Sequence, residues 1–166
     1  MKINHLAHAS FRASDFEKSL YFYEECLGLE RAFVITMGEF GPQLIPEGIS
    51  PEEEATLRAE FEARKDEIGI VYLKVAPGQF IEVFPGDPLL DKVKTGDRNG
   101  YLHLCLEVDD VKAWREHLIA KGANVTTEIS LGCDNAYQFW MKDPDGNEIE
   151  MMQYLPNAYQ LVGKGM

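Results

Sequence analysis

Two segments of this chain repeat each other, and each contributes one histidine and one glutamate at matching places. The first copy starts at His8 (His-Ala-Ser-Phe-Arg-Ala-Ser-Asp), and the second starts at His103 (His-Leu-Cys-Leu-Glu-Val-Asp-Asp). Each is followed by a Gly-x-x-Ile-Glu segment, which ends at Glu82 in the first half and at Glu150 in the second. Such a duplication predicts two similar structural units in one chain.

Hydrophobic periodicity and turn residues predict the same order of elements in both halves: a strand, a helix and then about three strands. The predicted strands are 3–12, 31–37, 70–75, 79–84, 101–108, 124–129, 136–142 and 148–154, and the predicted helices are 16–26 and 111–121. Asp15, or Ser14 before it, and Asp109 or Asp110 are suitable N-caps for the two helices. The chain is therefore expected to be an α+β protein of two βαβββ modules, at 1–96 and 97–166.

The first module is longer because of an insertion at about 38–69. Within it, Ser50-Pro-Glu-Glu53 is a capping-box pattern with proline at the first helical position, which predicts a charged helix from Pro51 to about Asp66. We interpret this helix as a solvated decoration of the module. The alternative is a lid or a dimer contact over the functional site.

Residue alternation places the four repeated residues on one kind of surface. Successive side chains of a strand point to opposite faces, and in 101–108 one set is apolar whereas the other contains His103. The same parity puts His8, Glu82 and Glu150 on the non-core face of their strands. Two imidazoles and two carboxylates are a suitable ligand set for one divalent metal ion, either Ni, Zn, Co, Mn or Fe.

Composition excludes several classes of partner. The net charge of −12 and the pI near 4.7 argue against binding to nucleic acid or to an anionic membrane. No apolar run is long enough to cross a bilayer, and no secretory signal is visible. The three cysteines show no Cys-x-x-Cys spacing, which favours a reducing, cytoplasmic location.

With these motifs in place, the chain resembles glyoxalase I within the wider vicinal oxygen chelate superfamily. The resemblance covers nearly the whole chain apart from the insertion. Its carriers are the segments 8–15, 22–23, 27–29, 79–84, 101–110 and 142–150.

The resemblance implies a fold and a ligand set. The paired βαβββ modules would form a cupped mixed sheet with one divalent metal ion in the cup, and family members are typically homodimers. The glyoxalase I ligands His, Glu, His and Glu fall on His8, Glu82, His103 and Glu150. The glutamate at position 82 distinguishes this chain from three groups of relatives. Dioxygenases bind the metal with two His and one Glu, epimerases carry glutamine at this position, and fosfomycin-resistance proteins carry histidine.

The resemblance also implies a reaction, the conversion of the hemithioacetal of methylglyoxal and a thiol to an S-2-hydroxyacyl thioester through a metal-stabilised enediolate. Glu150 is the first choice for the base that removes the carbon-bound proton, and Glu82 is the second. Arg12 falls where a glyoxalase I arginine meets the glutathione carboxylate; its alternative role is a surface ion pair. Phe84 and Trp140 are further substrate-binding candidates, or else core or interface aromatics.

Tyr101, on the same strand face as His103, completes the substrate-binding candidates. Gly86 and Asn99 stand where glyoxalase I members carry an asparagine and an arginine, which favours a second hypothesis: an epimerase or isomerase of another hydroxy-carbonyl compound. A third hypothesis is a non-catalytic protein that binds a small molecule in the cup.

Overall fold

The computed structural model describes residues 1–89 and 100–164, which divide into two compact units. The first unit contains residues 1–24 and 28–89 of this part, and the second contains 25–27 and 100–164. The predicted module boundary at 96 and 97 lies outside the described residues, as does Asn99. Each unit is an α+β module, which confirms the predicted fold class.

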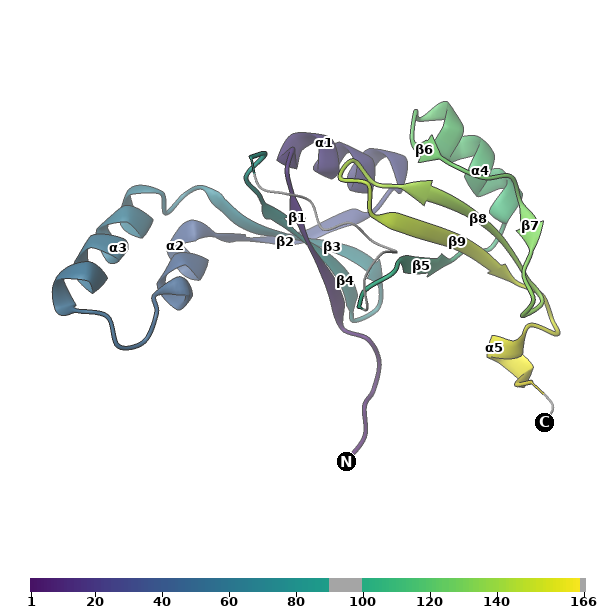
Figure 1. The fold of residues 1–166 in the computed structure, drawn as a ribbon, viewed down its shortest axis with the longest axis horizontal. Helices are drawn as coiled ribbons and strands as arrows, with labels where there is room; N and C mark the ends of the chain where they lie inside the picture. The colour runs from purple at the N-terminus through teal and green to yellow at the C-terminus, as the bar shows by residue number, and fades with distance from the viewer. Residues whose placement is uncertain (90–99, 165–166) are drawn as a thin grey trace. The chain divides into compact units, whose positions relative to one another are not determined.

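The first unit is a four-stranded mixed sheet with one helix against it (Figure 1). The sheet order is β1-β4-β3-β2, in which β1 runs parallel to β4 and the other pairs are antiparallel. Its elements are β1 (His8–Ala13), α1 (Phe16–Leu20), the π-helical segment η1 (Tyr21–Cys26), β2 (Glu30–Thr36), β3 (Ile68–Ala76) and β4 (Gln79–Pro85).

The second unit repeats this topology. Its sheet order is β5-β9-β8-β6, β5 runs parallel to β9, and a short strand β7 also pairs with β8. Its elements are β5 (Leu104–Glu107), α4 (Val111–Ala120), β6 (Asn124–Val125), β7 (Ser130–Leu131), β8 (Ala136–Lys142), β9 (Glu148–Tyr154) and the terminal helix α5 (Tyr159–Val162). The strand β1 of the first unit therefore corresponds to β5 of the second, and β4 corresponds to β9.

The two predicted N-caps begin the corresponding helices. The Asp15 carboxylate accepts a hydrogen bond from the Lys18 backbone N–H, and the Asp110 carboxylate accepts from the N–H groups of Lys112 and Ala113. These contacts satisfy N–H groups that have no partner within the helix. Gly28, which follows the first helix, has a φ of +67° that favours glycine.

Each sheet has one buried face, which we call the inner face, and one face that carries the repeated His and Glu residues, which we call the outer face. Alternate strand residues form the inner face, as the sequence predicted, and they are almost fully buried. In the first unit they include Val71, Leu73, Ile81 and Val83, and in the second they include Phe139, Met141, Ile149 and Met151. The apolar alternation of the strands thus makes one core for each unit.

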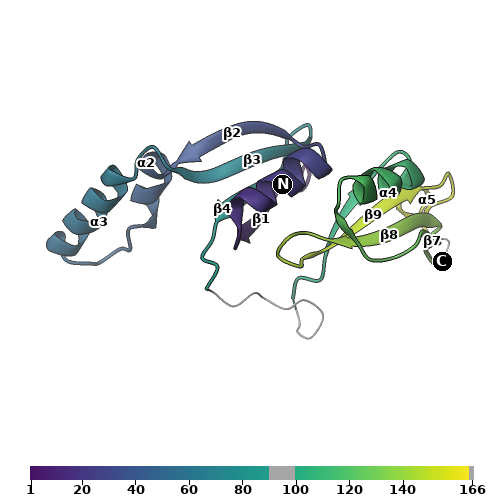
Figure 2. The same ribbon diagram turned by 90° about the horizontal axis from the view of Figure 1, so that it is seen from above.

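The insertion contains two short helical segments and one longer helix. They are α2 (Met37–Phe40), the 3-10 segment η2 (Gly41–Leu44) and α3 (Pro51–Ala63), and they lie beyond the ends of β2 and β3 (Figures 1 and 2). Ser50 and Glu53 form the predicted capping box, and no residue of α3 is buried. A hollow of about 370 Å³ in the insertion is lined by Gly38, Pro42, Arg58, Ala59, Phe61 and Glu62.

Three predicted strands differ from the observed ones by more than two residues at an end. The strand predicted at 3–12 begins at His8, and the one predicted at 101–108 covers only Leu104–Glu107. The strand predicted at 124–129 is wrong as one element, because β6 and β7 are separate two-residue strands. Between them the Thr127 hydroxyl, rather than a backbone carbonyl, accepts the backbone N–H of Trp140, which interrupts the ladder.

In the part of the chain that the structure describes, no helix combines the length and apolar composition that a membrane span requires.

Candidate functional site

The first unit brings His8 and Glu82 together on its outer face. Ser10 lies opposite Glu82 in the parallel β1–β4 pair, so His8 is one step along the same face. His8 Nδ1 lies 3.6 Å from Glu82 Oε1, and the Glu82 side chain is 6% exposed whereas that of His8 is 50% exposed. A buried carboxylate beside an accessible imidazole is a suitable place for a cation.

Two hydroxyl groups from the neighbouring strands hold the Glu82 carboxylate. Ser10 on β1 donates its hydroxyl to Glu82 Oε2, and Tyr72 lies opposite Glu82 in the antiparallel β3–β4 pair. The hydrogen bond with Glu82, then burial and the Glu82 charge, raise the pKa of the Tyr72 hydroxyl to about 12. Tyr72 therefore stays protonated and able to donate over the whole physiological pH range. We call His8, Glu82, Ser10 and Tyr72 the first half-site.

The second unit brings His103 and Glu150 together in a similar way. His103 Nε2 lies 3.4 Å from Glu150 Oε2, and the Glu150 side chain is 7% exposed. Cys105 on β5 and Trp140 on β8 lie opposite Glu150 on its two sides. Burial, then the charge of Glu150 and a hydrogen bond with it, raise the pKa of the Cys105 thiol to about 12. We call His103, Glu150, Cys105 and Trp140 the second half-site.

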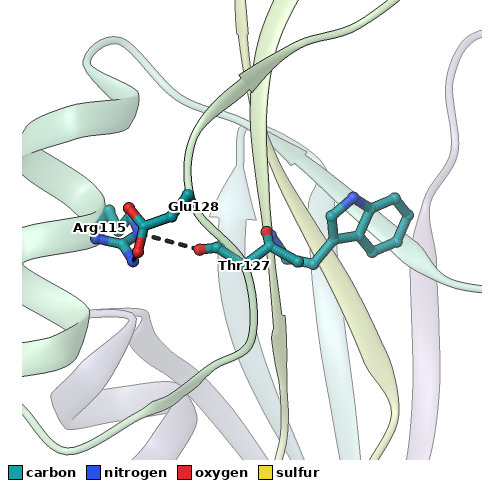
Figure 3. A network of polar contacts seen from close by, with 4 residues as sticks. Arg115, Thr127 and Glu128 are labelled. Atoms are coloured by element: carbon teal, nitrogen blue, oxygen red, sulfur yellow. Dashed lines mark hydrogen bonds and ion pairs between the residues drawn. The ribbon is translucent and has the colours of Figure 1, made fainter.

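Trp140 is fixed by contacts on its ring and on its backbone. The His103 and Trp140 ring centroids are 4.8 Å apart at an interplanar angle of 80°, an edge-to-face contact. The Trp140 backbone N–H donates to the Thr127 hydroxyl at 2.9 Å. Arg115 of α4 donates in turn to the Thr127 carbonyl oxygen and pairs with Glu128 (Figure 3). The helix α4 thus anchors the loop that supports Trp140.

The donor atoms of each half-site fit a divalent metal ion. Two ligands about 2.1 Å from one ion, at tetrahedral or octahedral angles, stand roughly 3.0–3.4 Å apart. The pairs at 3.6 Å and 3.4 Å are near this separation. Within either unit, the described residues form no group of three or more His, Cys, Asp or Glu side chains around one point. Each half-site therefore presents two candidate ligands, and a shared four-ligand site stays a prediction.

The predicted substrate-binding residues are divided between the units. Arg12 and Phe84 lie opposite each other in the β1–β4 pair, on the outer face of the first sheet, and Arg12 is exposed. Tyr101 precedes β5 and is 51% exposed; burial and then the charge of Asp143 raise the pKa of its hydroxyl. Trp140 belongs to the second half-site. Their contact with a substrate stays a prediction.

A backbone contact explains why glycine, and not the asparagine of glyoxalase I members, occupies position 86. The Gly86 N–H donates to the Ala13 carbonyl oxygen at 2.8 Å. A Cβ atom at position 86 would lie 2.5 Å from that oxygen and 2.9 Å from its carbon. This close approach of two backbones excludes an asparagine, so the position offers no side chain to a substrate.

Sequence reasoning missed most of the aromatic cluster on the outer face of the first sheet. The Phe33 and Tyr72 ring centroids are 4.2 Å apart, and Phe80 lies within about 6 Å of both. Phe84 contacts Phe40 of the insertion in the same way, at 5.7 Å. The sequence signal was incomplete, because a register shift between Lys74 and Ala76 brings Tyr72 opposite Glu82, where the two-residue turn alone would place Leu73.

This topology agrees with a comparison of the sequence with known families. Residues 2–151 match the model of the Glyoxalase/Bleomycin resistance protein/Dioxygenase superfamily. Because the match covers most of the chain, the protein belongs to this superfamily. A search of curated proteins finds no significant match.

Solved structures share the fold at low sequence identity. A glyoxalase family protein from Enterococcus faecalis is 20% identical with a TM-score of 0.63, over 92% of this chain and 99% of that one. Lactoylglutathione lyase from Agrobacterium tumefaciens is 18% identical with a TM-score of 0.55, over 92% and 96%. A glyoxalase/dioxygenase from Nostoc punctiforme is 18% identical with a TM-score of 0.56, over 92% of both chains. These likenesses concern the fold alone.

Proposed function

We propose that the protein is a metal-dependent lyase of the glyoxalase I type. His8, Glu82, His103 and Glu150 would hold one divalent metal ion, and the substrate would be the hemithioacetal of methylglyoxal and a thiol. The product would be an S-2-hydroxyacyl thioester. Like the glyoxalase I proteins that the sequence resembles, the chain is expected to act as a homodimer.

One observation supports this proposal most strongly, the repetition of a His–Glu pair on equivalent strands. In both units the carboxylate is nearly buried and the imidazole lies within 3.6 Å of it. Burial of a carboxylate is costly unless a cation or hydrogen bonds compensate it. The recurrence of this arrangement in two units of different sequence points to a shared ligand rather than to packing.

The chain's own residues would perform the proton transfer. Glu150 is the first choice to remove the proton from one carbon of the substrate and return it to the neighbouring carbon, and Glu82 is the second. The divalent ion would stabilise the negative charge that develops on the substrate oxygens. Arg12, exposed on the outer face of the first sheet, would pair with a carboxylate of the thiol.

The second candidate function is an epimerase or isomerase that acts on another hydroxy-carbonyl compound. The observation that favours it is Gly86, where the contact with the Ala13 carbonyl leaves no room for the asparagine of glyoxalase I. Both functions need the same ligands and the same proton transfer, so they differ in the substrate alone.

Metal binding and turnover test the proposal together. The metal-stripped protein is titrated with Ni²⁺ or Zn²⁺ by calorimetry, and the loaded protein is then given methylglyoxal and glutathione while thioester absorbance is followed. We expect one ion per chain, and we expect Glu82→Gln and Glu150→Gln each to weaken binding by more than about 100-fold. The control is Glu107→Gln on β5, an exposed glutamate that should leave the affinity unchanged.

The outcomes separate the candidates. Metal binding without thioester formation, but with exchange of a carbon-bound proton of another carbonyl compound in deuterated solvent, would select the epimerase or isomerase. A protein that is indifferent to both metal ions would contradict both enzymes.

A further inference from the structure

Within the proposed function, on which this inference rests, we propose that Ser10 and Tyr72 are positioning residues that fix the Glu82 carboxylate as a metal ligand. They direct Oε1 of Glu82 toward His8 and the ion while the hydroxyl of Ser10 occupies Oε2. Neither residue belongs to the predicted ligand set.

The strand register makes this arrangement possible. Glu82 lies on β4 between β1 and β3, with Ser10 directly opposite on one side and Tyr72 directly opposite on the other. Directly opposite residues on one face have their Cβ atoms about 4.5–5.5 Å apart, close enough for side chains to meet. The Ser10 hydroxyl donates to the carboxylate from one side, and Tyr72 lies beside Glu82 on the other.

The two oxygens of Glu82 have different partners. Ser10 Oγ donates to Oε2, and His8 Nδ1 lies 3.6 Å from Oε1. Because Oε2 is already engaged by a hydroxyl donor, Oε1 is the oxygen that remains directed to the imidazole. A metal ion held between His8 and Glu82 would therefore bind one oxygen of this carboxylate.

The second half-site supplies a contrast at the equivalent positions. Cys105 and Trp140 occupy the places beside Glu150 that Ser10 and Tyr72 occupy beside Glu82. A thiol is a weak donor, and the Trp140 ring packs on the edge of His103. The hydroxyl pair is therefore a property of the first half-site and not of the repeated scaffold.

Removal of either hydroxyl should weaken metal binding without unfolding the unit. Groups that orient a metal ligand typically contribute 10–100-fold to metal affinity. We expect Ser10→Ala and Tyr72→Phe each to weaken Ni²⁺ or Zn²⁺ binding to the full-length protein by about 10-fold, and the double variant by about 100-fold. Phenylalanine at position 72 retains the ring that stacks on Phe33 at 4.2 Å.

The affinities are measured by competition with a chromophoric chelator. Ser10→Thr, which keeps a hydroxyl, should restore the wild-type affinity. The control is Tyr137→Phe on β8, an exposed tyrosine outside both half-sites, which should change the affinity by less than about threefold. The urea unfolding curve of each metal-free variant shows whether the fold is intact, and unchanged midpoints with weaker binding support a positioning role.

Failure of the inference differs from failure of the proposed function. If the wild-type protein binds the ion and Ser10→Ala and Tyr72→Phe bind it equally well, positioning by these hydroxyls is overturned and the proposed function stands. Weaker binding that only accompanies a lower unfolding midpoint also overturns the positioning role. If the wild-type protein binds neither metal ion, the proposed function is overturned together with this inference.

Discussion

The two units place a histidine and a buried glutamate at equivalent positions of the sheet, but they surround the glutamate with different side chains. Glu82 accepts the Ser10 hydroxyl on one side and lies opposite Tyr72 on the other. Glu150 lies between the Cys105 thiol and the Trp140 indole. The duplication has thus kept the strand order and the His–Glu pair, while the residues beside each pair have diverged.

The outer faces of the two sheets also carry different side chains. The first carries the aromatic rings of Phe33, Tyr72 and Phe80, with Phe33 46% exposed. The second carries Glu107 and Gln138 among its polar residues, and its aromatic rings include those of Trp140 and Tyr154. In both units, by contrast, the fully buried residues of the inner face are apolar, so packing constrains the inner face more tightly than it constrains the outer one.

The largest expected effect tests the division into inner and outer faces. Leu73→Ala on the inner face of the first unit should lower the free energy of unfolding by about 2–5 kcal/mol, and Phe139→Ala in the second by about 3–5 kcal/mol. Both side chains are fully buried. Lys74→Ala, the exposed neighbour of Leu73, should change it by less than about 0.5 kcal/mol. Urea denaturation measures all three. A cost at Lys74 equal to that at Leu73 would contradict the assignment of faces.

A smaller effect tests the chemical contrast between the half-sites. Because burial and Glu150 raise the pKa of the Cys105 thiol to about 12, little thiolate is present at pH 8. Alkylation of Cys105 by iodoacetamide in the metal-free protein should therefore be at least about tenfold slower than in the urea-unfolded chain. The native rate should keep rising as the pH increases toward 11, since the protonated form is the one that folding favours. Peptide mass spectrometry follows the modification.

The matched variant for this measurement is Glu150→Gln. It removes one of the charges that oppose the thiolate, so the native alkylation rate should rise several-fold. A native rate at pH 8 equal to the unfolded rate would show that the second half-site does not stabilise the thiol.

The smallest expected effect compares the two helix caps. Asp110 accepts two backbone N–H groups whereas Asp15 accepts one. Asp110→Ala should therefore cost about 1 kcal/mol of stability, and Asp15→Ala somewhat less. Thermal unfolding measures both, with Asp110→Asn as a control that keeps the cap. Equal losses in the two variants would show that the second hydrogen bond contributes nothing.

Much of the fold could be predicted because local signals and periodicity agree with the tertiary structure. Strands β8 and β9 have their predicted bounds, and Asp15 and Asp110 cap the helices as expected. The α3 helix begins with the predicted capping box but ends at Ala63, three residues before the predicted end at Asp66. In these regions the residue types alone decide the conformation.

The errors fall where a strand depends on its neighbour. The ladder of β1 starts at His8 because its partner β4 begins at Gln79, directly after the turn. Periodicity within one segment contains no information about where the partner begins. His103 lies just before β5 for a related reason, since the β5–β9 ladder starts at the pair Leu104 and Ile149.

The short helix α2 was missed although its signal is present in the sequence. Thr36 and Glu39 form a capping box, the same pattern that predicted α3. Gly38 lies inside this pattern and Pro42 comes soon after it. Because both residues disfavour a helix interior, the sequence of the segment predicts a turn.

Parity predicted that His8, Glu82, His103 and Glu150 lie on the non-core faces, but it could not predict the contacts of His8 with Glu82 and of His103 with Glu150, which depend on the strand order. The contribution of Ser10 and Tyr72 was missed, because it depends on the register between three strands. Whether the two half-sites share one ion depends on how the units assemble, and periodicity within a strand carries no information on assembly.

The helix α3 has an evolutionary consequence. It contributes no buried side chain, and its capping box and the ion pair between Glu54 and Arg58 connect residues of the helix itself. Selection for a packed interior therefore exerts little pressure on its length or composition. Related chains should vary most in this segment, where residues can be gained or lost while the parent module is inherited unchanged.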